Sequence, residues 1–577
     1  MIAELRYPAK PAARLGRVLP RLSGGTIVGL ILLLVVGVIT LAPVVFVVLA
    51  SFDDAAATET WRWGLGGWIA AFTTGRTLQA IGYSFLLALR APFGAIVGSF
   101  FAWLLVRARI PGSALIEFAL WVAFFMPALS IAVGWTLLLD PHYGLLNQLT
   151  QILIGRPLFN IYSVAGILWV HLTLTTIPVM VMLLAPALRQ LDASFEEAAI
   201  MSGATRWQVL RRVVFPLIAP AFLTAVVAGF MRGLEAFEVE RFLGTPSGIS
   251  VYATRIYDLI GFSPPEFAQA MALSSVFLVI LLALAAGYQW NIDRWRHATV
   301  LGRGARFTPA RIGPWRWVAT GLLLAFVFVA VVVPVALLVL GSLMRLFGFF
   351  NIANAYTLNG WQAVLGNQAF VTSLRNSFVL GTSVGLIGVL LYGVLAWVLV
   401  RVRVLGRQAL GLLIWLPWAI PGILLGIALL WIVLAIPGLR LLYGTMAVLV
   451  LALLIQNMPF ATQILRAALG QVSLELEEAG RMSGAAWLTV YRRVLMPLIA
   501  PTLVSVFVLT FVASIRDISA TVLLSSASSQ PLAVLMLAFA TSGNMTAASA
   551  VGVILSLLAV GIAILARTRG LRLAVSA

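Results

Sequence analysis

The sequence of 577 residues contains no cysteine, a single lysine and only three histidines. Without cysteine, disulfides, thiolate zinc sites and thiol catalysis are all excluded. The lysine, Lys10, does not belong to a G-x-x-x-x-G-K-[ST] sequence, so the chain carries no standard P-loop for ATP hydrolysis. His142, His171 and His297 are far apart in sequence and form no ligand motif. We therefore expect no enzyme activity, no catalytic residue, no metal site and no cofactor in this chain.

Charged residues are also scarce, at 10% of the chain, whereas hydrophobic residues make up 62% and the mean hydropathy is +1.05. Such values indicate a polytopic membrane protein. Because about twenty apolar residues cross a bilayer, we expect an all-α fold with about twelve transmembrane helices. The expected spans are 26–50, 79–106, 113–139, 161–187, 217–236 and 267–290, then 316–342, 374–400, 409–435, 445–466, 498–518 and 546–566.

The spans divide the sequence into two transmembrane domains of six helices each. We expect a cytoplasmic tail at 1–25, a first domain at 26–290, a cytoplasmic linker at 291–315, a second domain at 316–566 and a cytoplasmic tail at 567–577. Because six spans return the chain to the same side, the two domains share one orientation. They form a parallel repeat around an axis along the membrane normal.

The net charge of +19 reflects membrane orientation rather than nucleic-acid binding, because the basic residues gather between spans. Of the 38 Lys and Arg residues, 27 lie in the two termini and in alternate loops. The positive-inside rule therefore predicts that both termini and these loops are cytoplasmic. The basic segments are 1–24, 107–112, 188–215, 291–316, 401–408, 466–493 and 567–577.

The most polar internal segment occurs twice. Residues 188–220 align without a gap to 469–501, with 18 identities in 33 positions. Each copy contains two glutamates, a glycine, two arginines and a Pro-Leu-Ile-Ala-Pro sequence at the same spacing. The residues are Glu196, Glu197, Ala198, Ala199, Gly203, Arg211, Arg212 and Pro216 in the first copy, and Glu477, Glu478, Ala479, Gly480, Gly484, Arg492, Arg493 and Pro497 in the second.

We expect each copy to fold as a helix-turn-helix in the cytoplasm. Alanine favours the first helix, and Gly203 and Gly484 can adopt the positive φ that ends it. A second helix then leads to Pro216 or Pro497 at the start of the next span. On the alternative interpretation, the arginines are only topological anchors and the acids only solvated helix faces. That alternative does not explain why the whole pattern recurs, so we favour a surface that binds a soluble partner.

The duplication extends beyond these loops. It includes helix ends, tryptophans and prolines that recur in the same order in both halves. The matched pairs are Gly67-Trp68 with Gly360-Trp361, Ser84-Phe85 with Ser377-Phe378, Trp103 with Trp397, Arg107 with Arg401, Pro127 with Pro417 and Pro178 with Pro459.

The repeated loop resembles the Glu-Ala-Ala, Gly and hydrophobic-Pro pattern of permease subunits of binding-protein-dependent ABC importers. The first copy matches at 197–199, Gly203 and Pro216, and the second at 478–480, Gly484 and Pro497, with Gly480 in place of the second alanine. The resemblance covers essentially the whole chain and implies a fused, two-domain permease of the type I ABC importer fold.

The resemblance also implies partners and a place in the cell. In that family the loop is a coupling helix that docks on an ATPase subunit. We thus expect ATP-driven import across a bacterial inner membrane, with two ATPase subunits that hold ATP and Mg on the cytoplasmic side. An extracytoplasmic solute-binding protein delivers the solute, and no nucleic acid is involved.

Two further segments, 237–257 and 516–524, are similar to the iron(III)-type permeases. Ferric iron is therefore the expected solute. Fused permeases of similar type handle phosphonate, thiamine and polyamines, so these remain alternatives. A transporter of another class, driven by an ion gradient, predicts acidic residues at mid-membrane and leaves the repeated loop unexplained. A membrane enzyme would need a cluster of catalytic side chains that the sequence does not offer.

Charged residues inside or near membrane spans are costly and often functional. Glu235 and Arg516 each lie 19 residues after the exit proline of their repeat. We hypothesise that these opposite charges pair across the pathway near its outer end. The alternative is that these two residues and the neighbouring Arg232, Glu238 and Asp517 all extend to the outer interface. The candidate pathway charges are Arg232, Glu235, Glu238, Arg516 and Asp517.

Overall fold

The computed structural model describes residues 24–55, 61–108, 110–295, 313–402 and 406–568. Within these ranges the chain is mainly helical, and two isolated bridges, Asp53–Trp63 and Met344–Tyr356, join described residues. In this described part, ten helices are long and apolar enough to cross a membrane, or twelve if each of two bent helix pairs counts as one span. The expected all-α fold is confirmed. The two tails and most of the linker lie outside the described residues.

The first half contains five straight candidate spans and one bent pair. Short 3-10 or π-helical turns are labelled η. The elements are α1 (Gly24–Ala50), α2 (Gly66–Thr73), α3 (Gly75–Ala88), α4 (Arg90–Arg107), α5 (Ser113–Phe125), α6 (Ala128–Leu139), α7 (Leu145–Ile154), α8 (Val164–His171), η1 (Leu172–Thr176), α9 (Ile177–Arg189), α10 (Ala193–Met201), α11 (Arg206–Val209), η2 (Leu210–Val214), α12 (Phe215–Leu234), η3 (Glu240–Gly244), η4 (Thr245–Ser247), α13 (Tyr252–Gly261) and α14 (Phe267–Trp295).

The second half repeats this order, with the spans again interrupted by one bent pair. Its elements are α15 (Trp315–Val327), η5 (Phe328–Val332), α16 (Val333–Ser342), α17 (Asn359–Leu365), α18 (Gln368–Arg401), α19 (Arg407–Trp415), η6 (Leu416–Ala419), α20 (Gly422–Ala435), η7 (Pro437–Leu442), α21 (Met446–Gln471), α22 (Leu474–Met482), α23 (Trp487–Val490), η8 (Tyr491–Leu495), α24 (Met496–Arg516), α25 (Leu532–Thr541) and α26 (Met545–Thr568).

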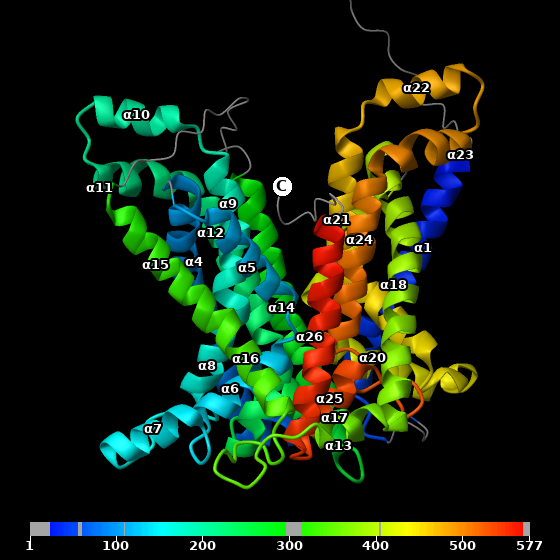
Figure 1. Cartoon of the computed structure of the whole chain (residues 1–577). Coiled ribbons are helices and arrows are strands. Elements are labelled where there is room, and N and C mark those ends of the chain that lie inside the picture. Colours follow the sequence, from blue (N-terminus) through cyan, green and yellow to red (C-terminus); the bar gives the residue numbers. More distant parts are fainter. Residues whose placement is uncertain (1–23, 56–60, 109, 296–312, 403–405, 569–577) are drawn as a thin grey trace, which may run out of the picture.

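The first span of each half packs against the other half. Helix α1 contacts α19 and α20 of the second half, while α15 and α16 contact α5 and α6 of the first. Figure 1 shows α1, in blue, on the side of the molecule that carries α18, and α15 on the opposite side, which carries α4. The two halves are therefore interlocked rather than merely apposed.

The third span of each half is broken. Helices α5 and α6 meet at 103°, and the run from α19 through η6 meets α20 at 105°. Pro127 is the N-cap of α6 and Pro421 is the N-cap of α20, so these two prolines are equivalent. The residue before each proline is extended, because the proline ring disfavours helical backbone there. The expected match of Pro127 with Pro417 is wrong, since Pro417 lies in η6, before the bend.

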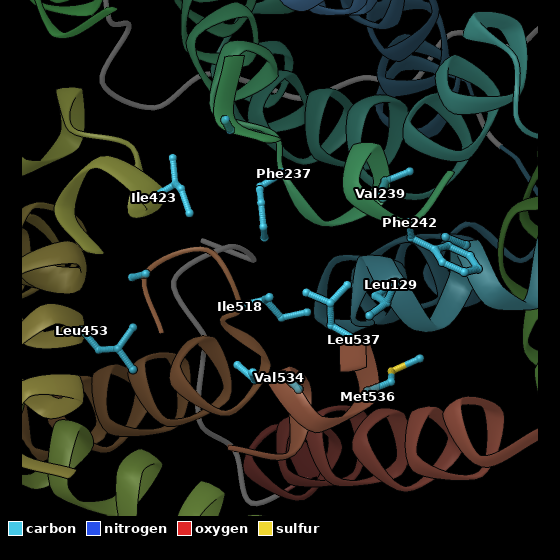
Figure 2. Packing of buried hydrophobic residues seen from close by; sticks show 14 of the residues in the cluster. Leu129, Phe237, Val239, Phe242, Ile423, Leu453, Ile518, Val534, Met536 and Leu537 are labelled. Atoms are coloured by element: carbon cyan, nitrogen blue, oxygen red, sulfur yellow. The ribbon is translucent and has the colours of Figure 1, made fainter. Parts of the chain in front are cut away.

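The two bundles converge at one end, where α13, α17 and α25 lie, and diverge toward the end that carries α10 and α22 (Figure 1). Apolar side chains fill the contact at the convergent end. Leu129 and Phe237 from the first half belong to the same buried cluster as Ile423 and Ile518 from the second. Figure 2 shows these four side chains gathered in one region between the halves. The core thus closes the space between the repeats at that end.

Candidate functional site

Each repeated loop begins with a capped helix of nine residues, α10 or α22. The side chain of Asp192 accepts a hydrogen bond from the backbone N–H of Ser194 at 3.0 Å. Ser473 plays the same part for the backbone N–H of Glu475 at 3.2 Å. Such caps satisfy backbone donors that have no partner inside the helix. Both loop helices therefore start at equivalent, well-defined positions.

The two turn glycines have the backbone that the sequence predicts. Gly203 has a φ of +83° and Gly484 a φ of +80°, both in the left-handed region. The next amide closes each turn onto the helix, from Ala204 to the carbonyl of Ala199 and from Ala485 to that of Gly480. The predicted role of the glycines as helix terminators is confirmed.

The second helix of each loop continues without a break into the membrane span. Residues 207–234 and 488–516 are both continuous helical runs, so the spans begin about ten residues earlier than the expected 217 and 498. Just before Pro216 and Pro497 the helix widens into the π-helical turns η2 and η8. Proline lacks an N–H, so the backbone near it departs from regular α-helical pairing. The second helix of each loop and the following span thus form one continuous helical run.

Large apolar side chains are exposed at equivalent positions of the two loops. Met201 and Met482 are each 88% exposed, the highest values among the large apolar residues described. The pairs Phe195 with Leu476 and Trp207 with Leu488 are exposed as well. Beside them lie the exposed carboxylates Glu197 and Glu478, the alanines Ala198 and Ala479, and the exposed arginines Arg211, Arg212, Arg492 and Arg493. A contiguous exposed apolar patch with a polar rim indicates a protein contact.

Gly480, which replaces the alanine of the family pattern, sits at a close helix contact. A Cβ atom added there would lie 3.0 Å from a methyl group of Val490. The equivalent Ala199 packs against the cluster that contains Val209. The departure from the pattern therefore lets α22 and α23 pack closely and leaves the exposed face unchanged.

The first glutamate of each copy is turned inward, to an arginine at the end of an earlier span. Arg107 lies 3.3 Å from Glu196, and Arg401 lies 2.6 Å from Glu477. Sequence reasoning did not assign the two arginines to the loops. The available signal was that Arg107 and Arg401 recur in the duplicated pattern together with the glutamates.

The candidate pathway charges do not form the expected pair. Glu235 pairs with Arg232 of its own helix at 2.9 Å. Arg516 instead donates a hydrogen bond to the carbonyl of Phe124 at 2.6 Å and stacks over its ring. Among the described residues no ion pair joins Glu235 to Arg516. Since Phe124 belongs to α5, Arg516 does connect the two halves, but through a backbone carbonyl.

Glu238 and Asp517 are the other two candidate pathway charges. They approach each other from opposite halves, and Arg516 lies near both. Burial first, and the neighbouring Asp517 carboxylate second, raise the pKa of Glu238 to about 8. These three ionisable residues therefore gather where the halves meet, in the same region as the buried Phe237 and Ile518.

A second group of buried charges was missed by sequence reasoning. His171 Nε2 lies 2.8 Å from a carboxylate oxygen of Glu240, and Arg90 lies 3.6 Å from the same oxygen. All three side chains are buried. No sequence motif links the three residues, because no spacing rule connects positions so far apart in the chain. Within the described residues no cluster of three His, Asp or Glu side chains is placed to hold a metal ion.

A cavity of about 460 Å³ lies at the convergent end, between the two halves. The first half contributes Arg241 and Tyr257, and the second half contributes hydroxyl and amide groups. Arg241 pairs with Asp258 at 2.5 Å and stacks over Tyr257. The polar residues of the second half are Ser525, Ser526, Gln530 and Thr541.

Sequence comparison places the chain among transport proteins. The ferric transport system permease protein FbpB of Actinobacillus pleuropneumoniae is 27% identical over 442 residues, which cover 74% of this chain and 62% of that protein. The Fe(3+)-transport system permease protein FbpB 2 of Haemophilus influenzae is 23% identical over 504 residues, 86% of this chain and 89% of that protein. The chain thus spans less than two thirds of the first relative.

A solved bacterial ABC transporter involved in the import of alginate shares 18% identity, with a TM-score of 0.40, over 47% of this chain and 96% of that chain. The sequence profile of the binding-protein-dependent transport system inner membrane component matches residues 63–296 and again 385–569. Each match includes one of the repeated loops, and together the two cover most of the chain. The chain therefore belongs to the family of binding-protein-dependent transport system inner membrane components, as a permease with two fused domains.

Proposed function

We propose that this chain is the transmembrane permease subunit of an ATP-driven importer of ferric iron, which takes its solute from an extracytoplasmic binding protein. One observation carries the proposal: two equivalent loops expose the same apolar and acidic surface at one end of a pseudo-symmetric membrane protein. A chain without a P-loop needs another chain to supply energy, and two matching surfaces suit two copies of one ATPase. ATP and Mg are bound on those partner subunits and not on this chain.

The ATPase subunits contact the α10 and α22 surfaces from the cytoplasm. Their exposed methionines suit such a contact, because the flexible thioether side chain adapts to the shape of a partner. The positive-inside rule supports the cytoplasmic placement of these loops and of both termini. The opposite, convergent end then faces the solute-binding protein, and the cavity lined by Arg241 and Ser526 is where a delivered solute first meets the permease.

Ferric iron is the proposed solute because three relatives that align over most of this chain are described as ferric transport permeases. Phosphonate, thiamine and polyamines are the alternatives within the same machinery. An ion-coupled transporter is a weaker alternative, because it gives the two duplicated loop surfaces no role.

Replacement of the exposed methionines tests the docking surface. The Met201→Arg, Met482→Arg double variant is expected to lose a co-expressed cognate ATPase on affinity purification in mild detergent, because a charge replaces the centre of each apolar contact. The Met201→Leu, Met482→Leu variant keeps the apolar surface and is expected to retain the ATPase. Full retention by the arginine variant would contradict the docking assignment.

Uptake by proteoliposomes tests the solute. Vesicles that contain the chain and its ATPase, with ATP inside and the cognate binding protein outside, are expected to accumulate radioactive iron loaded on that protein. Accumulation of a phosphonate, thiamine or a polyamine in place of iron would contradict the iron assignment but would still support the proposal that the chain belongs to an importer.

A further inference from the structure

We propose that Arg107 and Arg401 are positioning residues that fasten the two docking loops to earlier membrane helices, so that a movement of the loops is passed along those helices. The inference rests on the proposed function, since it assumes that an ATPase moves the loops. It concerns the permease's own residues and requires nothing of the ATPase beyond docking.

In the first half the contact joins the last residue of α4 to the docking loop. A terminal nitrogen of Arg107 lies 3.3 Å from a carboxylate oxygen of Glu196, in the first turn of α10. The same nitrogen donates a hydrogen bond to the carbonyl of Leu191 at 2.9 Å. Leu191 directly precedes the cap of α10, so the arginine holds both the entry to the loop helix and its first turn.

The second half repeats the contact with equivalent residues, although different nitrogen atoms of the arginine face the glutamate. Arg401 is the last residue of α18, and its Nε lies 2.6 Å from a carboxylate oxygen of Glu477 in α22. Its Nη2 donates to the carbonyl of Val472 at 2.6 Å and to that of Leu469 at 3.0 Å. Val472 occupies the position of Leu191 in the other copy, directly before the cap of the loop helix. Two independent copies of one geometry indicate a requirement common to both halves.

Both arginines are buried, although they lie at the polar end of the molecule. Their side chains are 2% and 8% exposed. A buried charge that loses its partner is strongly destabilising, whereas an exposed pair contributes little. The glutamates therefore cannot leave the arginines at low cost, and the loop helices keep a fixed position relative to α4 and α18.

The other ends of the same spans are tied to the segments that line the contact between the halves. In the first half Arg90, at the opposite end of α4, lies beside Glu240 of η3, and Ser84 of α3 accepts a hydrogen bond from Tyr252 at 2.8 Å. In the second half Ser377 of α18 accepts the equivalent bond from Leu532 at 2.7 Å. Helices α3–α4 and α18 thus connect a docking loop, at one end, to a pathway segment at the other.

A helix fixed at both ends moves as a rigid body, which is how packed helices pass a displacement across a membrane protein. In this arrangement each arginine–glutamate contact, Arg107–Glu196 or Arg401–Glu477, connects a docking loop to a helix that reaches the pathway. We call each of these contacts a joint. Without the joint, the ATPase still docks on the exposed methionines, but its movement reaches only the span that follows the loop, α12 or α24.

The test removes both charges of each joint, so that no buried charge is left unpaired. The variant carries Arg107→Met, Glu196→Leu, Arg401→Met and Glu477→Leu, and is measured in proteoliposomes with the cognate ATPase and binding protein. We expect the ATPase to co-purify as with the wild type, while the solute transported per ATP hydrolysed falls at least about fivefold, the lower range of measured couplings between sites.

A matched control is the exposed pair Arg189–Glu117, which joins α9 to α5 in the first half. The Arg189→Met, Glu117→Leu variant removes the same chemical groups from an exposed position and is expected to keep the wild-type ratio of transport to hydrolysis. A milder variant, Arg107→Lys with Arg401→Lys, keeps the charge but loses the planar fork that reaches two acceptors. Its ratio of solute transported to ATP hydrolysed is expected to lie between that of the wild type and that of the apolar variant.

An unchanged ratio in the apolar variant, with the ATPase bound, would overturn the proposal. Loss of ATPase binding in that variant would also overturn it, because the pairs would then shape the docking surface. If the apolar variant does not fold, an unchanged ratio in the lysine variant overturns the proposal in its place. Failure of the wild-type chain to bind any P-loop ATPase would instead contradict the proposed function itself, so the two failures are distinguishable.

Discussion

Gly203 and Gly484 set the shape of the docking loops because their backbone lies where other residues are strained. A Cβ atom added at either position would meet no other atom within 4 Å, so the cost of a substitution there comes from the backbone alone. The space around each glycine is open, so a partner protein can approach it closely. The positive φ of each glycine, by contrast, is unfavourable for any residue that has a Cβ. Glycine is therefore required at these two positions by the backbone conformation and not by close packing.

Substitution of these glycines tests that distinction. Gly203→Ala and Gly484→Ala are each expected to destabilise the local turn by about 1–2 kcal/mol, the cost of left-handed backbone for a residue with a Cβ. We expect weaker ATPase retention on purification, with an almost unchanged melting temperature for the membrane part. Gly470→Ala is the control, since Gly470 lies in the last turns of α21 with ordinary backbone and open space. Equal retention of the ATPase by all three variants would show that the left-handed turn is not needed for ATPase binding.

Glu235 and Arg516 show that equivalent positions in a sequence repeat do not predict which charged side chains form an ion pair. Glu235 and Arg516 occupy equivalent places in the repeats, yet Glu235 pairs with a neighbour on its own helix. Repeat symmetry places equivalent residues around an axis, but it does not determine how far each lies from that axis. Rotation of the helix and the local backbone decide which partner is within reach.

At the scale of elements, the close contact of α6 with α16 is what interlocks the halves. Gly134 of α6 faces the backbone of Pro334 in α16 so closely that a Cβ atom would lie 2.2 Å from the proline carbonyl. Small residues let helices approach closely in a membrane, where lipid offers no hydrophobic driving force for association. The contact thus depends on the absence of a side chain.

Gly134→Ala is therefore expected to push α16 away and to destabilise the protein by about 1–3 kcal/mol, the usual cost of overpacking. The measurement is the thermal unfolding of the purified protein in detergent, monitored by tryptophan fluorescence. Gly321→Ala in α15 is the control, because that glycine has open space around it and is expected to leave the unfolding temperature unchanged. An unaltered temperature for the Gly134 variant would contradict the close approach of the two helices.

At the scale of the whole molecule, the two helix bundles converge at one end and diverge toward the end that carries α10 and α22 (Figure 1). Ser130 of α6 donates a hydrogen bond to the carbonyl of Gly552 in α26 at 3.4 Å, across the boundary between the halves. A Cβ atom at Gly552 would lie 3.2 Å from the Ser130 hydroxyl. On the proposed function, import of a solute from that side requires such contacts to open.

The absence of native cysteine makes this contact directly testable. In the Ser130→Cys, Gly552→Cys variant the two Cβ atoms are close to the separation that a disulfide needs. We expect the oxidised variant to form the bond and to stop transport, and reduction to restore it, because the halves cannot separate while linked. A gel of the chain cut by protease in the linker reports the bond. Full transport by the completely cross-linked protein would show that these helices need not part.

Much of this protein follows from its sequence alone, because the deciding properties are local. Hydrophobic length sets each span, the arrangement of arginines predicts the orientation, and the duplicated loop predicted the helix, the glycine turn and the exposed face. The bends of the third spans were not predicted, because 113–139 and 409–435 each read as one long, largely apolar span. Hydropathy registers only that a segment avoids water, so it cannot detect a turn inside the apolar layer.

Only the tertiary structure decided which helices and charges meet. The exchange of the first spans, the equivalence of Pro127 with Pro421, the Arg107–Glu196 joint and the buried group of Arg90, His171 and Glu240 all depend on contacts between distant segments. In a bilayer, lipid and a neighbouring helix are equally apolar, so the hydrophobicity of a span does not show which of its faces contacts another helix. Close packing and the pairing of buried charges select among those arrangements, and both depend on the folded geometry of the whole chain.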